Sequence, residues 1–188
     1  MPSVLNVAQA VYDELGWVDS WRLQKLTYYA EAWHLAWFGK RLVDEDFQAW
    51  VDGPVSPDLY RENKHREART STELAKANAS VLTTEQWSTV RSVIEFYGKW
   101  TKQDLIDKTH GELPWLEARG ELDVHEYSSQ TISQETMMRF YRQQEASGSP
   151  VPVRPVEAVN TWAGADLQSG FAHNVQRWAE AIELLADR

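Results

Sequence analysis

The chain has 188 residues, enough for one globular domain with its own hydrophobic core and an additional segment. It contains no cysteine, which excludes disulfide bonds, thiolate metal ligands and a cysteine nucleophile. The formal net charge is −9, from 19 basic and 28 acidic residues, so a phosphate backbone is not expected as the main ligand.

The first two predicted helices differ in character. The first begins after Ser3 as N-cap and ends at Leu15, before Gly16. The second runs from Trp21 to Trp37 and is apolar on almost every face. Its few polar residues form one narrow stripe: Gln24, Thr27, Glu31 and His34. A helix that is apolar nearly all round is usually surrounded by other elements, so we predict a mainly α-helical, compact domain around a buried central helix.

One lysine interrupts the apolar part of this central helix. Lys25 shares its sector with Trp21, Tyr28 and Tyr29. An ammonium group there must extend to solvent or meet a carboxylate or backbone carbonyls. The sequence leaves two interpretations open: a structural ion pair, or a contribution to a recognition site.

A small β-hairpin is predicted after the central helix. Segments 41–43 and 47–51 have the pattern of short strands, and an acidic turn at 44–46 joins them. The Gly-Pro pair at 53–54 is expected to end the second strand.

Helix signals recur along the rest of the domain. A segment at 63–80 is predicted to be an exposed loop or a weak helix, and residues 121–131 to be a loop. A further helical turn starts at Pro114 and stops at Gly120. Four other helix starts are predicted by Ser56 with Pro57, by the capping box Thr83/Gln86, by Thr101 with Asp104, and by the N-cap Ser133.

The C-terminal part has a different composition. Residues 147–155 contain three of the seven prolines and a Ser-Gly-Ser run, which indicates a linker. Beyond it, apolar residues recur with helical spacing at Phe171, Val175, Trp178, Ile182 and Leu185. We therefore divide the chain into a domain at 1–145 and, at 146–188, a Pro-rich linker with a C-terminal amphipathic helix. The apolar side of that helix must be covered by the domain, by a partner or by a second copy.

Several of these residues, in this order, carry a resemblance to a known family. They are Leu23-Gln24-Lys25-Leu26, Tyr28-Tyr29, Trp33, Ala49-Trp50, Gly53-Pro54-Val55, Pro57, Tyr60, Thr109-His110 and Pro114-Trp115. Over about residues 1–145 the chain resembles the Panacea (SocA-like) antitoxin domain of bacteria and phages. The resemblance implies a small, mostly helical domain that binds and neutralises unrelated toxin proteins. One member of the family acts instead as an adaptor that delivers its toxin to a protease.

Signals for catalysis are weak. The chain has no Gly-rich phosphate loop with lysine, no Gly-x-Ser-x-Gly turn and no His-Glu-x-x-His motif. His110 with Glu112 is the nearest approach to an acid–base pair, but a capping or buried hydrogen-bonding role for His110 is favoured. The acidic turn could bind a divalent ion, although three acids in an exposed turn usually face water. We predict no catalytic residue, no metal site and no cofactor.

The predicted function is that of an antitoxin that neutralises a cognate protein toxin by direct stoichiometric binding. Five acids and no base lie between residues 43 and 59, and such a surface complements a basic toxin cleft. The alternatives are a proteolytic adaptor and, less favoured, a small enzyme. The candidate toxin-binding residues are Lys25, Tyr28, Asp44, Glu45, Asp46, Trp50, Asp52, Asp58, Tyr60 and Trp178.

The expected setting is the cytoplasm. No apolar run approaches the roughly 20 residues of a membrane-spanning helix, and the first residues lack the pattern of a signal peptide. No membrane partner is expected, and nucleic acid is disfavoured by the charge. A homodimer or a higher complex with the toxin stays open, as does the identity of the toxin.

Overall fold

The computed structural model describes residues 1–63 and 71–156. Residues Met1–Pro155 form one compact unit. The predicted amphipathic helix with Trp178 lies outside the described residues.

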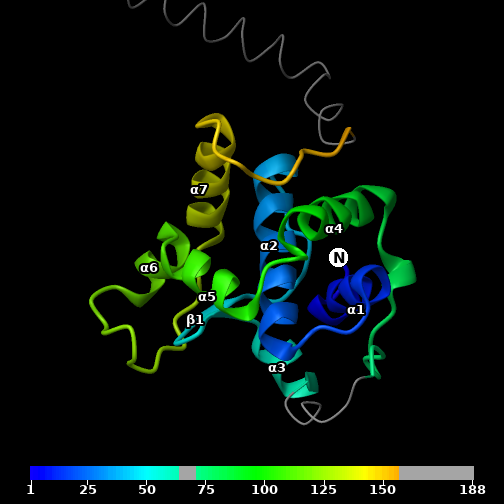
Figure 1. Ribbon diagram of the computed structural model, residues 1–188, viewed down its shortest axis with the longest axis horizontal. Coiled ribbons are helices and arrows are strands. Elements are labelled where there is room, and N and C mark those ends of the chain that lie inside the picture. The colour runs from blue at the N-terminus through cyan, green and yellow to red at the C-terminus, as the bar shows by residue number, and fades with distance from the viewer. Residues whose placement is uncertain (64–70, 157–188) are drawn as a thin grey trace, which may run out of the picture. The chain divides into compact units, whose positions relative to one another are not determined.

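The domain is mainly α-helical, as predicted. The described residues form seven α-helices, one 3-10 turn and a two-stranded antiparallel sheet (Figure 1). The helices are α1 (Val4–Leu15), α2 (Ser20–Phe38), α3 (Pro57–Asn63), α4 (Thr84–Tyr97), α5 (Lys102–His110), α6 (Leu113–Arg119) and α7 (Gln134–Ala146). The 3-10 turn is η1 (Ala79–Val81), and the strands are β1 (Gln48–Trp50) and β2 (Gly53–Val55).

Helix α2 is the centre of the core. It lies between α7 on one side and α1 with α4 on the other (Figure 1), and it also contacts α3, α5 and β2. Every residue from Leu23 to Trp37 is buried. Trp33 is 1% exposed and packs against the rings of Trp37 and Tyr141. The prediction of a buried central helix is confirmed.

The polar stripe of α2 is buried as well, and each member has a hydrogen-bond partner. Thr27 bonds within the helix to the carbonyl of Leu23, and His34 Nδ1 lies 3.0 Å from Thr89 Oγ1. One oxygen of Glu31 accepts from the backbone N–H groups of Leu42 and Val43, at 2.7 and 3.0 Å. A buried polar group is tolerated only when it is bonded, so the stripe joins α2 to neighbouring segments.

The hairpin is present, but its position differs from the prediction. The strands pair with Gln48 opposite Val55 and Trp50 opposite Gly53, so the turn lies at 51–52. The expected strand at 41–43 and the acidic residues 44–46 form bends instead. Pro54 lies inside β2, where a breaker was expected. Within the sheet β2 pairs only with β1, and proline is accepted in such an edge strand because its missing N–H is not needed.

Helix termini follow the predicted signals closely. The capping boxes of α4 and α5, Thr83/Gln86 and Thr101/Asp104, are both formed. Ser133 caps α7 through the N–H of Thr136. These signals are local, because the cap and its target lie three residues apart.

The segment expected to be a linker packs on the domain. Pro152 and Pro155 are buried. The hydroxyl of Ser92 in α4 donates to the carbonyl of Val153, and Arg154 pairs with Glu145 of α7. The packed unit therefore extends to Pro155.

Candidate functional site

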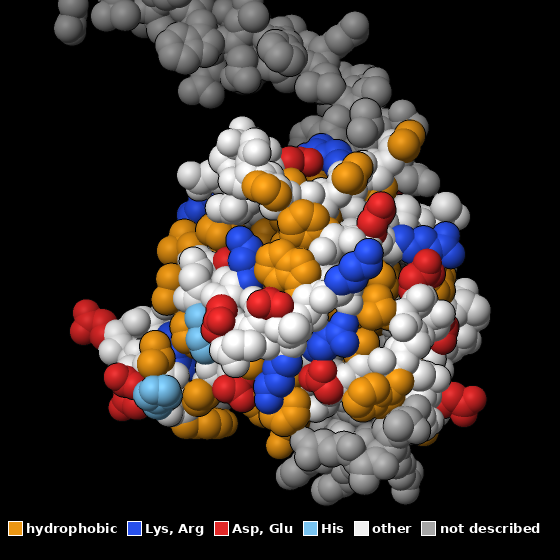
Figure 2. Space-filling view, in the orientation of Figure 1, with side chains coloured by type: hydrophobic (Ala, Val, Ile, Leu, Met, Phe, Trp, Pro, Cys, Tyr) orange, Lys and Arg blue, Asp and Glu red, His pale blue; other side chains and the backbone are white. Residues whose placement is uncertain are grey.

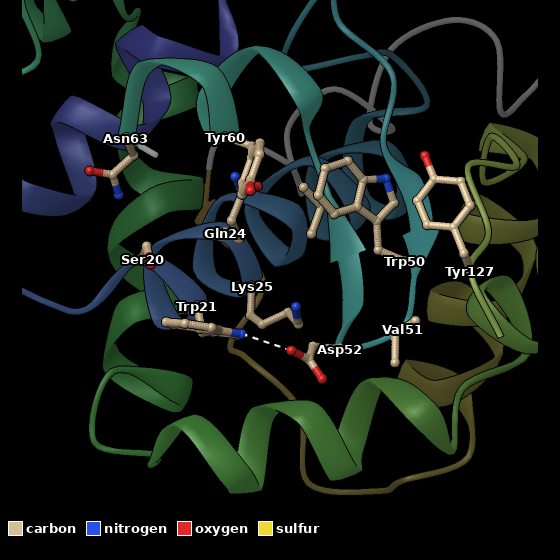
Figure 3. Close-up of a pocket in the computed structure, with 11 residues that line it drawn as sticks. Ser20, Trp21, Gln24, Lys25, Trp50, Val51, Asp52, Tyr60, Asn63 and Tyr127 are labelled. Atoms are coloured by element: carbon tan, nitrogen blue, oxygen red, sulfur yellow. Dashed lines mark hydrogen bonds between the residues drawn. The ribbon is translucent and has the colours of Figure 1, made fainter. Parts of the chain in front are cut away.

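A cavity of about 300 Å³ lies between the start of α2, the hairpin and α3 (Figure 3). Residues of five segments line it: Ser20, Trp21, Gln24 and Lys25; Trp50, Val51 and Asp52; Val55; Tyr60 and Asn63; and Tyr127. A second cavity of about 220 Å³ shares Ser20, Trp21 and Asn63 with the first and extends toward Trp17. The two hollows together flank the first turn of α2.

Lys25 is the buried charge of this cavity. Its side chain points from α2 toward the hairpin, with the amino group between Trp50 and Asp52 (Figure 3). The residue is 1% exposed, and its amino group donates one long hydrogen bond, 3.3 Å, to the carbonyl of Pro54. Burial lowers the pKa of Lys25 to about 7, and the charge of Asp52 opposes part of this shift. At neutral pH the ammonium and the amine are therefore close in free energy.

Asp52 lies at the exposed rim of the same cavity. Its carboxylate accepts a hydrogen bond of 3.0 Å from the indole Nε1 of Trp21 (Figure 3). Lys102 of α5 places its amino group 3.4 Å from the centre of the Trp21 ring, a cation–π contact. The rim thus carries one acid and one base, both accessible to solvent.

Aromatic side chains form the outer wall. The rings of Trp50 and Tyr60 meet edge to face with centroids 4.9 Å apart. Tyr60 is 39% exposed and Tyr127 is 75% exposed. A partly open aromatic wall above a buried charge is typical of a binding site.

The hairpin is held rigidly against its neighbours. Gln24 clamps the backbone of Ser56, accepting from its N–H at 2.9 Å and donating to its carbonyl at 3.3 Å. On the other side, Trp115 Nε1 of α6 donates to the carbonyl of Trp50 at 2.9 Å. The N–H of Ala49 donates to the carbonyl of Gln130 at 2.8 Å. The cavity wall is therefore preformed.

Gly53 allows the backbone of the hairpin to lie close to the side chain of Lys25. Its φ of +96° belongs to the left-handed region, and a Cβ placed on it would lie 2.6 Å from Lys25 Cε and 2.6 Å from Thr109 Oγ1. Only glycine fits there. Gly53 thus leaves room for the side chain of Lys25 beside the hairpin.

The structure brings together four of the ten predicted site residues. Lys25, Trp50, Asp52 and Tyr60 line the cavity. Tyr28 is completely buried in the core, against Phe47 and Tyr141. Trp178 lies outside the described residues.

The remaining acids lie away from the cavity lining. Glu45 accepts from the N–H of Val4 at 2.8 Å, and Asp46 pairs with Arg41 at 2.8 Å. Asp44 is exposed near the amino terminus, and Asp58 of α3 pairs with its neighbour Arg61.

Sequence reasoning missed several lining residues. Trp21 could have been found, because it lies four residues before Lys25 on the same helix face. Gln24 was assigned to a polar stripe without a partner. Tyr127 comes from a loop far along the chain, and no local signal connects it to α2.

His110 and Glu112, the nearest approach to an acid–base pair in the sequence, share no hydrogen bond. His110 stacks on Trp115, with centroids 4.1 Å apart, and its pKa is lowered mainly by burial. Glu112 points into a group of buried tyrosines, where it accepts from Tyr141 at 2.6 Å and from Tyr29 at 3.3 Å. Burial raises the pKa of Glu112 to about 7. The two side chains thus occupy different surroundings.

Three further observations concern residues 1–63 and 71–156. No group of three or more His, Asp or Glu side chains in this part could hold a metal ion. None of its helices has the length and apolar character needed to cross a membrane. On the face shown in Figure 2, basic and acidic side chains alternate, so that face presents no continuous basic surface to a phosphate backbone.

Comparison with known proteins gives one match. The family described as "Antitoxin SocA-like, Panacea domain" matches residues 23–116. Searches of curated proteins and of solved structures found no significant match. The matched range includes α2 from Leu23 onward, the hairpin and α3, which together supply most of the residues that line the cavity. The chain therefore belongs to the SocA-like antitoxin family defined by the Panacea domain, and this membership supports a role related to a toxin–antitoxin system.

Proposed function

We propose that this protein neutralises a cognate protein toxin by direct stoichiometric binding, and that the surface around the cavity is the contact site. The observation that carries the proposal is the partly exposed aromatic wall formed by Trp50 of the hairpin, Tyr60 of α3 and Tyr127 of the loop between α6 and α7. Family membership gives the class of partner.

The physical argument is one of preorganisation. Tryptophan and tyrosine are the residues that most often dominate the free energy of protein association. Here two hydrogen bonds hold Trp50 in place: its carbonyl accepts from Trp115, and its indole N–H donates to Gln48 at 2.8 Å. A wall that is ordered before binding loses little conformational entropy on association.

Charge supports the same class of partner through acids at the cavity rim and away from it. The exposed acids Asp44, Asp46 and Asp52 follow one another along the chain segment that leads into and through the hairpin. A toxin that acts on RNA or nucleotides needs a basic cleft, and an acidic surface would speed the encounter with it. Neutralisation would follow from occlusion of that cleft.

Co-expression tests this function. The chain would be produced together with the toxin encoded next to it. We expect rescue of growth and a stable stoichiometric complex on size-exclusion chromatography. Rescue with a falling toxin level and no complex would favour the protease-adaptor alternative, and turnover of a substrate by the isolated protein would favour an enzyme.

Variants locate the contact. Trp50→Ala and Tyr60→Ala are each expected to weaken toxin binding by tenfold or more, corresponding to about 1.4 kcal/mol or more. Trp87→Ala is the matched control, because Trp87 is a partly exposed tryptophan of α4 that does not line the cavity. Equal losses in all three variants would argue against the assigned surface.

A further inference from the structure

The floor of the cavity carries a cation whose hydrogen-bonding capacity is mostly unused. Lys25 is 1% exposed, and an ammonium group has three hydrogens to donate. Among the described residues, one acceptor is within reach, the carbonyl of Pro54 at 3.3 Å. No carboxylate of these residues lies within ion-pair distance of its amino group.

The surroundings of Lys25 indicate the sign of the charge that the cavity accepts. Asp52 is the acid that acts most strongly on Lys25, but it lies at the exposed rim, where solvent screens its charge. Asp52 already accepts from Trp21. Lys102 adds a second positive charge next to Trp21. The buried Lys25 therefore has the largest effect on the electrostatic potential inside the cavity, because charges interact more strongly there than at the rim.

The walls of the cavity also restrict the group that can enter it. A group that reaches Lys25 must pass between Trp21 on one side and Trp50 with Tyr60 on the other (Figure 3). Such walls favour an apolar body and a single polar end.

We propose that this cavity receives a carboxylate carried on an apolar stem, which the bound toxin presents to the amino group of Lys25. This proposal rests on the proposed function and specifies the chemistry of the partner at that site. The carboxylate lies at the floor of the cavity and accepts charge-assisted hydrogen bonds from Lys25. The stem packs against Trp50 and Tyr60. The carboxylate belongs to an Asp or Glu side chain or to the end of the toxin chain.

Three probes of similar shape test the chemistry without the toxin. Phenylacetate, phenylacetamide and 2-phenylethylamine would be titrated into the full-length protein at pH 6.0, where Lys25 carries its proton. The readout is the shift of the indole N–H signals of Trp21 and Trp50 in NMR spectra, with the core residue Trp33 as internal reference. We expect phenylacetate to bind about tenfold tighter than the neutral amide, and the amine to bind most weakly.

Two variants assign that preference to residues. Lys25→Met keeps the length of the apolar stem and removes a buried charge, so the fold is expected to persist. It should abolish the preference for the acid. Asp52→Asn can still accept from Trp21 and leaves Lys25 in place, so the preference for the acid should remain. Preferential binding of the amine, or an unchanged preference for phenylacetate in Lys25→Met, would overturn the proposal.

The toxin complex provides a separate measurement. Lys25→Met should weaken toxin binding by about tenfold while the melting temperature is kept. If the variant binds the toxin as tightly as the wild type, this inference fails and the proposed function stands. If the wild type binds no toxin, the proposed function fails, while the probe titrations still decide the chemistry of the cavity. A short extension of the toxin C-terminus weakens binding only if the end of the chain supplies the carboxylate.

Discussion

Buried ionisable side chains distinguish this small domain, and Glu112 is the most informative of them. It is 3% exposed, and its carboxyl group lies among Tyr28, Tyr29 and Tyr141. Burial raises the pKa of Glu112 to about 7, although hydrogen bonds from Tyr141 and Tyr29 and the charge of Lys108 act in the opposite direction. The folded protein therefore holds this proton at a pH where the unfolded chain has lost it.

The sign of the pH effect follows from linkage. Between the ordinary pKa of 4.5 and the raised value of about 7, the folded state binds more protons than the unfolded state. The contribution of Glu112 to stability is therefore lost as pH rises through this range, by about 3 kcal/mol in total. Glu112→Gln cannot titrate and can still accept from Tyr141. We expect its free energy of unfolding, measured by urea denaturation, to rise relative to the wild type between pH 4.5 and pH 7.5.

The comparison with the wild type cancels the other titrating groups. Glu31, with a pKa of about 7, and His34, with a pKa of about 3, also contribute to the pH dependence, and both are retained in the variant. Glu121→Gln serves as the control, because Glu121 is an exposed glutamate. A pH dependence in Glu112→Gln equal to that of the wild type would show that Glu112 titrates normally.

At this scale the sequence predicts which residues are unusual better than it predicts their partners. Lys25 was recognisable because a charge interrupted an apolar helix face. The sequence did not show that Lys25 faces Gly53 and the carbonyl of Pro54, because these residues lie almost thirty positions away and meet α2 only after folding. Glu112 was noticed for its neighbour His110, yet its partners are tyrosines of α2 and α7.

Among the elements, the hairpin depends most on a single backbone position. Gly53→Ala would place a Cβ 2.6 Å from Lys25 Cε and Thr109 Oγ1, in addition to the strain of a positive φ. Gly120→Ala is the matched control, because Gly120 also has a positive φ, +60°, and a Cβ added there would have no atom within 4 Å. We expect Gly53→Ala to cost about 1–3 kcal/mol more in urea denaturation than Gly120→Ala. Equal costs would mean that the floor of the cavity can relax.

The acidic bend at 44–46 is the second element with a testable role. Glu45 and Asp46 make structural contacts, with Val4 and Arg41, whereas Asp44 is 58% exposed and lies 3.9 Å from the terminal amine. Asp44→Lys is therefore expected to slow toxin association severalfold at low salt, with an unchanged melting temperature. Stopped-flow mixing at two salt concentrations measures this. An association rate and salt dependence equal to those of the wild type would exclude steering through Asp44.

Elements with local signals were predictable, and those with distant partners were not. The caps of α4, α5 and α7 were read correctly because each involves residues three positions apart. The hairpin was displaced because Pro54 was interpreted as a breaker. Its place in β2 depends on pairing with Ala49, and β1 is held on its other side by Gln130. These contacts cannot be seen in a local window of sequence.

For the whole molecule, the end of the packed unit decides how a truncation behaves. Residues 147–155 pack on the domain, since Pro152 and Pro155 are buried and Val153 bonds to Ser92. A chain ending at Ala146 loses these contacts and the ion pair between Arg154 and Glu145. We expect its melting temperature to fall, whereas a chain ending at Val156 should melt like the full-length protein.

Toxin titration of the same two truncated chains addresses the function of residues 157–188. Their sequence places Phe171, Val175, Trp178, Ile182 and Leu185 on one helical face, which must be covered. An isolated helix of this length is marginal in water, so packing must stabilise it. If the toxin provides that packing, the chain ending at Val156 keeps its melting temperature and loses toxin affinity, which is the result we expect. A lower melting temperature would place the helix on the domain instead. If the chain ending at Val156 melts like the full-length protein and binds the toxin with full affinity, residues 157–188 are needed neither for stability nor for toxin binding.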